Sequence, residues 1–288
     1  MKLKNENNPF QGNFTINLMG ELMDLSTPRV MGILNLTPDS FYDGGQHQEK
    51  DAYLFQVERM LSEGADLIDI GAVSSKPGAD IVDEKEERKR LMPALKKIVL
   101  SFPEAKISID TFRSKIAAEA LNEGASMIND ISAGSFDSNM FSIIAKYNCP
   151  YVLMHMQGEP QNMQENPTYD DVVKEVFAFF TEKIESLHTS GVKDILLDLG
   201  FGFGKTLDHN YQLLNELDYF IHLKYPVLAG LSRKSMIQKT LNTSAYSSIN
   251  GTTAAHTIAL MKGVKILRVH DVLEAKQAID IVEMCQKH

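Results

Sequence analysis

The stretch RVMGILNLTPDSF, residues 29–41, passes from a continuous apolar run into a loop of polar side chains. Between Val30 and Leu34 there is no alternation of polar and apolar residues, a pattern typical of a parallel strand covered on both faces. Asn35, Asp39 and Ser40 then bring more hydrogen-bonding groups than a plain turn needs. The stretch therefore predicts a buried strand whose carboxyl end opens into a functional loop.

Seven further runs of this kind follow, each separated from the next by a helical pattern. They are ADLIDIGA (65–72), KISID (106–110), SMINDI (126–131), YVLMH (151–155), DILLDL (194–199), PVLAGL (226–231) and KILRVH (265–270). Eight such units in 288 residues predict an α/β fold, a (β/α)8 TIM barrel formed by a single domain over residues 1–288. Residues 1–28, which include FTINLMGELMDLS, are predicted to form a short hairpin that closes the barrel bottom.

The composition excludes several classes of protein. Hydrophobic residues make up 43% and charged residues 23%, as in ordinary globular proteins, and the net charge of -9 argues against nucleic acid or an anionic membrane as the main partner. The two cysteines, Cys149 and Cys285, have neither metal-ligand nor redox spacing. No run approaches the roughly 18 apolar residues of a membrane helix, and the N-terminus does not resemble a signal peptide. We therefore expect a cytoplasmic protein that acts on small molecules.

Polar side chains gather at the predicted carboxyl ends of the strands, where active sites of such barrels lie. They are Asn35, Asp69, Asp110, Asn129, His155, Asp198, Ser232, Arg233, Lys234, Arg268 and His270. Each alone has an ordinary structural explanation, such as a helix cap, a turn or a solvated charge. Convergence from eight strands favours a site, because burying unpaired polar groups is costly.

These side chains separate by chemistry into two groups. Asp110, Asn129 and Asp198 offer acceptors that suit a flat heterocycle rich in N–H groups. Lys234, Arg268 and His270 offer donors and positive charge that suit phosphate oxygens, and Asn35 offers an oxygen to Mg²⁺ shared with such phosphates. A site that holds both a heterocycle and a phosphate indicates group transfer.

Two motifs require a choice between alternatives. GFGFGKT (200–206) is similar to a phosphate-binding P-loop, but Leu199 stands where that motif requires its first glycine. Its glycines are instead expected to let the loop approach a ligand, with Phe203 packing on a ring; a flexible turn is the alternative.

In SRKSM (232–236), Ser235 lies near the start of a predicted helix, where backbone N–H groups and the helix dipole favour binding of a carboxylate. The alternative is that Ser235 is only a helix-start residue.

Taken in order, the motifs resemble those of the dihydropteroate synthases over residues 29 to 283. They are NLTPDSF (35–41), SSKPGA (74–79), SIDT (108–111), INDI (128–131), LMHMQG (153–158), GFGFGK (200–205), GLSRKSM (230–236) and RVHDV (268–272). The resemblance implies a pterin-binding barrel that joins 6-hydroxymethyl-7,8-dihydropterin pyrophosphate to 4-aminobenzoate with Mg²⁺. It also implies a homodimer and inhibition by sulfonamides.

The resemblance further implies a role for each matching residue. The pterin site would be formed by Asp110, Asn129, Met156, Asp198 and Lys234. Pyrophosphate would be bound by Asn35, Arg268 and His270, with Asn35 also binding the Mg²⁺. The aminobenzoate site would be formed by Ser75, Lys76, Pro77, Phe203 and Ser235. The loop after Asn35 would be a lid that brings Asp39 to the reacting centre. The residues expected to act in catalysis are Asn35, Asp39, Lys234, Arg268 and His270.

Three departures from the family pattern are visible. Val73 stands where Glu is more frequent, and Leu199 stands where Pro is more frequent. Lys76 stands where Arg is more frequent, and lysine keeps the charge but lacks the planar guanidinium that binds phosphate through two hydrogen bonds.

Two other functions are considered. One alternative is a corrinoid methyltransferase that shares the pterin site, and the other is a barrel that binds pterin without catalysis. The chain shows no G-x-S-x-G, no H-E-x-x-H and no cysteine beside a plausible base, which favours direct transfer over covalent catalysis.

Overall fold

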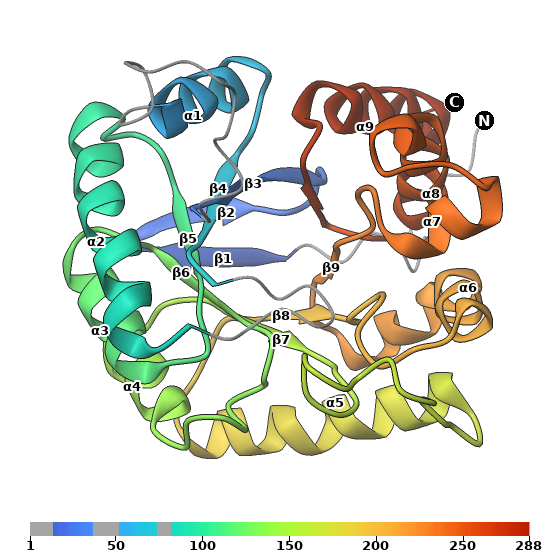
Figure 1. Ribbon diagram of the computed structural model, residues 1–288, viewed down its shortest axis with the longest axis horizontal. Coiled ribbons are helices and arrows are strands. Elements are labelled where there is room, and N and C mark those ends of the chain that lie inside the picture. The colour runs from blue at the N-terminus through green and yellow to red at the C-terminus, as the bar shows by residue number, and fades with distance from the viewer. Residues whose placement is uncertain (1–13, 37–51, 74–81, 288) are drawn as a thin grey trace, which may run out of the picture.

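The computed structural model describes residues 14–36, 52–73 and 82–287, and within them eight parallel strands close into a barrel (Figure 1). The strands are β3 (Arg29–Asn35), β4 (Leu67–Gly71), β5 (Ile107–Asp110), β6 (Met127–Asp130), β7 (Tyr151–Met154), β8 (Ile195–Asp198), β9 (Val227–Ala229) and β10 (Ile266–Val269). They pair in chain order, and β10 closes the ring against β3. The predicted (β/α)8 TIM barrel is confirmed.

Helices surround this barrel as the sequence predicts. They are α1 (Ala52–Ser62), α2 (Glu84–Ser101), α3 (Ser114–Asn122), α4 (Met140–Tyr147), α5 (Val172–Thr189), α6 (Leu207–Asn215), η2 (Leu217–Leu223), α7 (Ser235–Leu241), η3 (Tyr246–Ser248), α8 (Ile249–Met261) and α9 (Val272–Lys287). Apolar residues spaced by three and four, such as Val173, Phe180 and Ile184 on α5, lie buried against the strands. None of the helices described here is long and apolar enough to cross a membrane.

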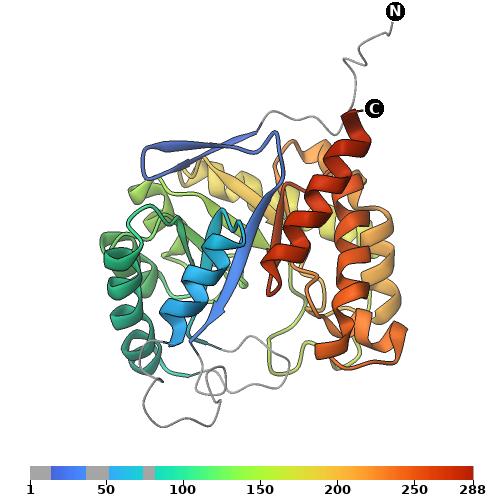
Figure 2. The same cartoon turned by 90° about the horizontal axis from the view of Figure 1, so that it is seen from above.

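An N-terminal hairpin covers one end of the barrel (Figure 2). It consists of β1 (Thr15–Leu18) and β2 (Glu21–Asp24), which pair antiparallel. Ile16, Leu18 and Leu25 are buried against the inward side chains at the amino ends of the strands, including Met31 and Leu67. The predicted hairpin at the barrel bottom is therefore confirmed from residue 14 onward, whereas residues 1–13 of the predicted segment lie outside the described residues. The opposite end of the barrel is left as the mouth.

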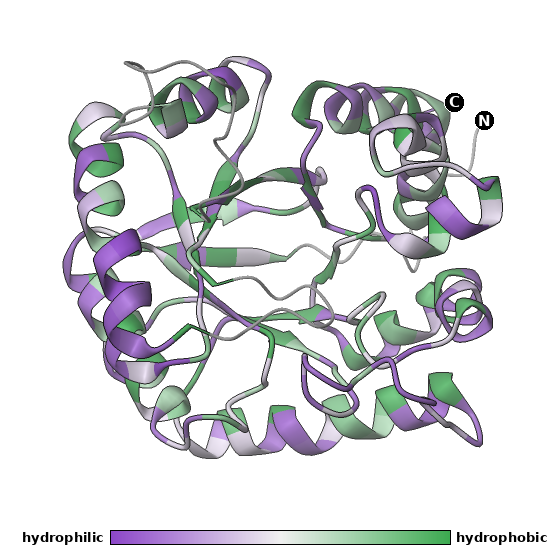
Figure 3. Cartoon of the chain, in the orientation of Figure 1, coloured by the Kyte–Doolittle hydropathy of each residue, from purple (hydrophilic) through white to green (hydrophobic). Residues whose placement is uncertain are grey.

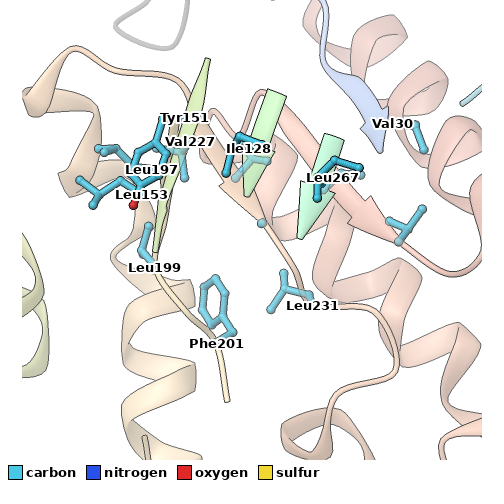
Figure 4. Close-up of a cluster of buried hydrophobic side chains, with 14 of the residues drawn as sticks. Val30, Ile128, Tyr151, Leu153, Leu197, Leu199, Phe201, Val227, Leu231 and Leu267 are labelled. Atoms are coloured by element: carbon cyan, nitrogen blue, oxygen red, sulfur yellow. The ribbon is translucent and has the colours of Figure 1, made fainter. Parts of the chain in front are cut away.

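The main core lies between the strands and the helices and includes the apolar side chains that point outward from the strands. Figure 3 shows hydrophobic segments along the barrel strands, and Figure 4 shows part of this core as sticks. Leu153, Leu197 and Leu267 belong to it and are fully buried. Each such side chain stabilises the fold by about 1.5–3 kcal/mol. Because both the outward and the inward faces are apolar near the bottom, the strands read as continuous hydrophobic runs in the sequence.

Candidate active site at the barrel mouth

The interior of the barrel is apolar at the bottom and becomes polar one layer higher, toward the mouth. Leu67, Met127, Leu196 and Ile266 form part of the apolar layer at the bottom. Because side chains alternate along a strand, the next inward residues lie two positions later. Those positions hold Asp69, Asn129, Asp198 and Arg268. The strand period therefore places charged and amide groups in one layer below the mouth.

Arg268 is the centre of this polar layer. Its Nε donates to Asp69 Oδ2 at 2.7 Å, and its Nη2 donates to Asp110 Oδ2 at 2.9 Å. Asn129 Nδ2 also donates to Asp69 Oδ2, at 3.1 Å. Burial opposes the charge of Arg268, but the two carboxylates raise the pKa of the guanidinium above its ordinary value. One cation thus holds two carboxylates in the barrel interior.

The carboxyl group of Asp110 is shifted strongly by this environment. Burial raises its pKa to about 7, and the carboxylates of Asp69 and Asp130 add to the shift while the guanidinium of Arg268 opposes it. A carboxyl group with this pKa changes its protonation near neutral pH. Asp110 can therefore accept a hydrogen bond as a carboxylate or donate one as an acid, depending on pH.

Two buried acceptor atoms in this layer have no hydrogen-bond partner among the described residues. They are Asp69 Oδ1 and Asn129 Oδ1, and the two side chains are at most 3% exposed. Buried polar atoms in native proteins are nearly always paired, so such atoms point to a missing donor. A ligand with N–H groups, such as the predicted heterocycle, would satisfy both.

Lys234 and Asp198 face each other across a space left by a glycine. A β-carbon built on Gly230 would lie 3.8 Å from both Asp198 Oδ2 and Lys234 Nζ. The ammonium of Lys234 donates to the carbonyl of Phe201 and lies 4.8 Å from the centre of the Phe203 ring. Burial, and then the charge of Arg268, lowers the pKa of Lys234 to about 8. Its chemistry grouped this lysine with the phosphate-binding cations, whereas the family resemblance grouped it with the pterin residues. The structure places it beside Asp198, which belongs to the pterin group.

An apolar wall stands beside the polar layer. Phe112, Ile131 and Met154 are buried together, with Val73, Met156 and Phe203 packed against them. The wall lies at the carboxyl ends of β5, β6 and β7, next to Asp110 and Asn129. A flat ring could rest on it while its edge contacts the polar layer. Met156 and Phe203 are thus brought to the predicted site, and Val73, one of the departures from the family pattern, belongs to the same wall.

His270 and Asn35 lie at the rim. The backbone N–H of His270 donates to Ser232 Oγ at 3.2 Å, and His270 Nδ1 is 3.1 Å from the same oxygen. Asn35 is the last residue of β3 and is half-buried. Within the part of the chain that the structure describes, no group of three or more His, Cys, Asp or Glu side chains could hold a metal. One amide oxygen nevertheless fits Mg²⁺ that is shared with a diphosphate, because Mg²⁺ takes few protein ligands and keeps several waters.

The GFGFGK loop departs from its prediction in the role of its glycines, and its lysine agrees with the rejection of a P-loop. A β-carbon on Gly200 would lie 1.8 Å from the carbonyl oxygen of His155, and one on Gly204 would lie 2.2 Å from that of Gln157. The close approach that requires glycine is thus to a neighbouring backbone, rather than to a ligand as we expected. Lys205 Nζ, which would bind phosphate in a P-loop, is buried and donates at 3.0 Å to the carbonyl oxygens of Gly200 and Phe203.

His155 also departs from the prediction that all eight strand ends converge on the mouth. Its ring packs edge-on against Phe179 of α5 at 4.9 Å, and its Nδ1 is 2.9 Å from Lys205 Nζ. Burial lowers the pKa of the imidazole well below its ordinary value, with the charge of Lys205 adding to the effect. Because His155 follows inward-facing Met154 by one residue, it faces the helices instead of the site.

Four of the predicted site residues, Asp39, Ser75, Lys76 and Pro77, lie outside the described residues, as does the loop after Asn35 that is predicted to be a lid. Ser235 is the first residue of α7 and is exposed. Conversely, sequence reasoning placed Asp69 at a strand end but gave it no role, although it is fully buried and central to the polar layer. Asp69 lies two residues after Leu67 and therefore faces the same side of the strand, but only the structure shows that Leu67 faces inward.

Comparisons with known proteins identify the family of this chain. The model of the pterin binding enzyme family matches residues 31–270. The chain is 46% identical over 261 residues to the dihydropteroate synthase of Haemophilus influenzae, covering 90% of this chain and 94% of that one. The chain belongs to the dihydropteroate synthases. These synthases are transferases of folate synthesis, so the corrinoid methyltransferase and the barrel without catalysis are both set aside.

Solved dihydropteroate synthases have the same fold. The synthase of Yersinia pestis, in a complex with a sulfonamide drug, has a TM-score of 0.89 and 44% identity, covering 96% of this chain and 100% of that one. The synthase of Xanthomonas albilineans with 4-aminobenzoic acid has a TM-score of 0.90 and 39% identity, covering 96% and 99% of the two chains. Ligands named for these relatives thus match the second substrate that the motifs implied and the class of inhibitor expected to mimic it.

Proposed function

We propose that this synthase condenses 6-hydroxymethyl-7,8-dihydropterin pyrophosphate with 4-aminobenzoate to give 7,8-dihydropteroate and pyrophosphate. The observation that carries the proposal is the polar layer in the barrel interior, which also contains Asp198 and Lys234. In this layer, the buried acceptor atoms Asp69 Oδ1 and Asn129 Oδ1 have no hydrogen-bond donor among the described residues. A pterin ring offers N–H groups on one edge and acceptors on another, which suits this mixture of carboxylates, amide and ammonium.

In the proposed pterin site, Asp110, Asn129 and Asp198 accept from the ring nitrogens, and Lys234 donates to a ring acceptor. The apolar wall that includes Met156 packs on one ring face. Asp69 takes part by holding Arg268 and Asn129 in place, through bonds of 2.7 and 3.1 Å. The tight packing of these groups would exclude water from the heterocycle, which strengthens each hydrogen bond to it.

The proposed diphosphate site lies above this layer, at the rim. His270 and Asn35 occupy the ends of β10 and β3, which are neighbours in the closed barrel. Arg268 contacts Asp69 and Asp110 in the interior and lies at the end of β10, close to His270 in the chain. Its charge would therefore act on the leaving group as well as on the ring. Mg²⁺, held by Asn35 and the diphosphate oxygens, would neutralise part of the leaving-group charge.

The proposed aminobenzoate site adjoins Phe203 and Ser235. The Phe203 ring packs against the wall and below the ammonium of Lys234, at 4.8 Å. We propose that the benzoate ring lies against Phe203 and that its carboxylate reaches Ser235, with Ser75, Lys76 and Pro77 contributing from the loop after β4. Both substrates would then meet on the same side of the barrel mouth.

The proposed reaction needs no enzyme nucleophile. The bond between the exocyclic carbon of the pterin and the diphosphate oxygen breaks, and its electron pair leaves with the diphosphate. The amine of aminobenzoate attacks that carbon, forms the new carbon–nitrogen bond and loses a proton to solvent or to the departing diphosphate. Arg268 and His270 stabilise the negative charge that builds on the leaving group, while Lys234 and the carboxylates hold the ring in position. Asp39 is proposed to reach the reacting centre from the loop after β3.

The test is a coupled measurement on the purified chain with Mg²⁺ and both substrates. We expect pyrophosphate and dihydropteroate to appear in equal amounts, and a sulfonamide to compete with aminobenzoate. Asp110→Asn should weaken pterin binding, whereas Asp66→Asn at the other end of the barrel should not. Pyrophosphate release without dihydropteroate would mean hydrolysis, and pterin binding without either product would refute the proposed reaction.

We also propose that the functional form is a homodimer, as the family resemblance implies. Sedimentation equilibrium of the purified chain would test this directly. A mass equal to one 32.2 kDa chain at micromolar concentration would refute it.

A further inference from the structure

Arg233 directly precedes Lys234, a proposed pterin-site residue, but turns its side chain away from it. Its Nε and Nη2 donate to the two carboxylate oxygens of Asp271, at 2.8 and 2.7 Å. Its Nη1 donates to the carbonyl oxygens of Ala245 and Tyr246, at 3.1 and 3.2 Å. Four of the five guanidinium N–H groups are therefore committed to the protein. Arg233, which the sequence placed among the polar residues at the barrel mouth, is instead engaged in holding two loops.

The backbone at Arg233 explains how neighbouring residues point in opposite directions. Its φ is +54°, in the left-handed region that non-glycine residues rarely adopt. The strained turn is held by hydrogen bonds from Arg233 N to Thr252 Oγ1, at 3.1 Å, and from Gln238 Nε2 to the Arg233 carbonyl, at 2.7 Å. The turn directs Lys234 toward the barrel interior and Arg233 toward α8 and α9.

The partner of this arginine adjoins the other proposed site residue at the rim. Asp271 directly follows His270, and His270 N donates to Ser232 Oγ, the residue before Arg233. The loops after β9 and β10 are thus joined by two adjacent contacts, His270 with Ser232 and Asp271 with Arg233. Burial disfavours the charge of Asp271, but the hydrogen bonds and charge of Arg233, with smaller effects of His270 and His256, hold its pKa below the ordinary value. The pair therefore remains ionised at neutral pH.

We propose that Arg233 and Asp271 are a positioning pair that fixes Lys234, on one loop, relative to His270, on the other. The inference rests on the proposed function, because it assigns Lys234 to the pterin and His270 to the diphosphate of the same substrate. Group transfer needs the breaking bond and the attacking amine to be aligned, so a small shift between these loops lowers the rate. A bidentate arginine–carboxylate pair fixes relative orientation in a way that a lysine cannot.

The test compares Arg233→Lys with Asp271→Asn and the double variant, with Arg29→Lys as a matched control. Arg29 also pairs with an aspartate, Asp66, at 3.1 Å and similar exposure, but at the bottom of the barrel. We expect Arg233→Lys and Asp271→Asn each to lower kcat at least tenfold, with the KM for aminobenzoate changed less than threefold. The double variant should be no worse than the poorer single variant, because the pair acts as one unit.

Binding measurements distinguish positioning from the other possibilities. Calorimetry with inorganic pyrophosphate and Mg²⁺ should show weaker binding to both single variants, although neither residue is proposed to touch the anion. Weaker binding with Arg233→Lys alone would make the arginine a direct ligand and overturn the proposal. A full kcat in either single variant, or a loss equal to that of Arg29→Lys at the same decrease in Tm, would also overturn it.

Two further outcomes are informative. If Asp271→Asn does not fold, Asp271→Glu keeps the charge but moves the carboxylate, and it should show the same fall in kcat. If the native chain makes no dihydropteroate, the proposed function fails. The pair is then judged by pyrophosphate binding alone, where unchanged affinity in both single variants would refute it.

Discussion

Replacing Arg268 by Met is expected to destabilise the protein in a strongly pH-dependent way. Arg268 contacts Asp69 at 2.7 Å and Asp110 at 2.9 Å, and the three side chains are 19%, 0% and 14% exposed. Removing one partner of a buried ion pair costs about 3–5 kcal/mol, since it leaves charge without compensation. In a chain of this size, 1 kcal/mol corresponds to roughly 2 °C in Tm. The variant should therefore melt about 6–10 °C lower than the native chain at pH 8.

The dependence on pH follows from Asp110. Burial raises the folded-state pKa of this carboxyl to about 7, and the guanidinium of Arg268 opposes that shift. Without Arg268, the folded variant therefore binds this proton more tightly than the unfolded chain does as pH falls. Its stability relative to the native chain should therefore recover at pH 5.5. The assay is thermal unfolding followed by circular dichroism at both pH values, with Arg29→Met as the control for a lost arginine.

An equal decrease in Tm at pH 8 and pH 5.5 would refute this reasoning, because it would show that Arg268 stabilises through packing instead of through charge. A decrease below about 2 °C at pH 8 would mean that the two carboxylates are already protonated or solvated in the native chain. Either result would also argue against the proposal that the charge of Arg268 stabilises the leaving diphosphate.

Three further outcomes can be checked at the site. Asp110→Asn should weaken pterin binding by about 10- to 100-fold, since a hydrogen bond to a charged group is worth about 1.5–3 kcal/mol; unchanged affinity by calorimetry would remove Asp110 from the site. Gly230→Val should reduce pterin affinity more than tenfold by filling the space between Asp198 and Lys234, whereas Gly230→Ala, whose β-carbon would lie at 3.8 Å from both, should be tolerated; equal affinities would contradict this geometry. The pH profile of kcat/KM should be bell-shaped, since the Asp110 carboxylate is lost below a pKa of about 7 and the Lys234 charge above a pKa of about 8; a flat profile from pH 6 to 9 would contradict both assignments.

The sequence by itself determined the secondary structure and the family. Continuous apolar runs gave all eight barrel strands, and the spacing of apolar residues by three and four gave helices such as α5 and α9, because both signals are local. The short helices η2 and η3 were not predicted. Glycines at helix ends, such as Gly64 and Gly124, were readable for the same reason, since each has a positive φ that favours glycine. The ordered polar motifs identified the family without any knowledge of their contacts.

Only the tertiary structure decided which strand-end residues face the interior and what they touch. Asp69 and His155 are both polar residues at strand ends, yet Asp69 lies in the polar layer while His155 packs against α5. With apolar side chains on both faces of these strands, the sequence has no alternation from which to read the inward face. The pairs that define the site also join residues far apart in the chain, 199 positions for Arg268 with Asp69 and 38 for Arg233 with Asp271. Their meeting depends on the closure and register of the barrel, which no local pattern encodes.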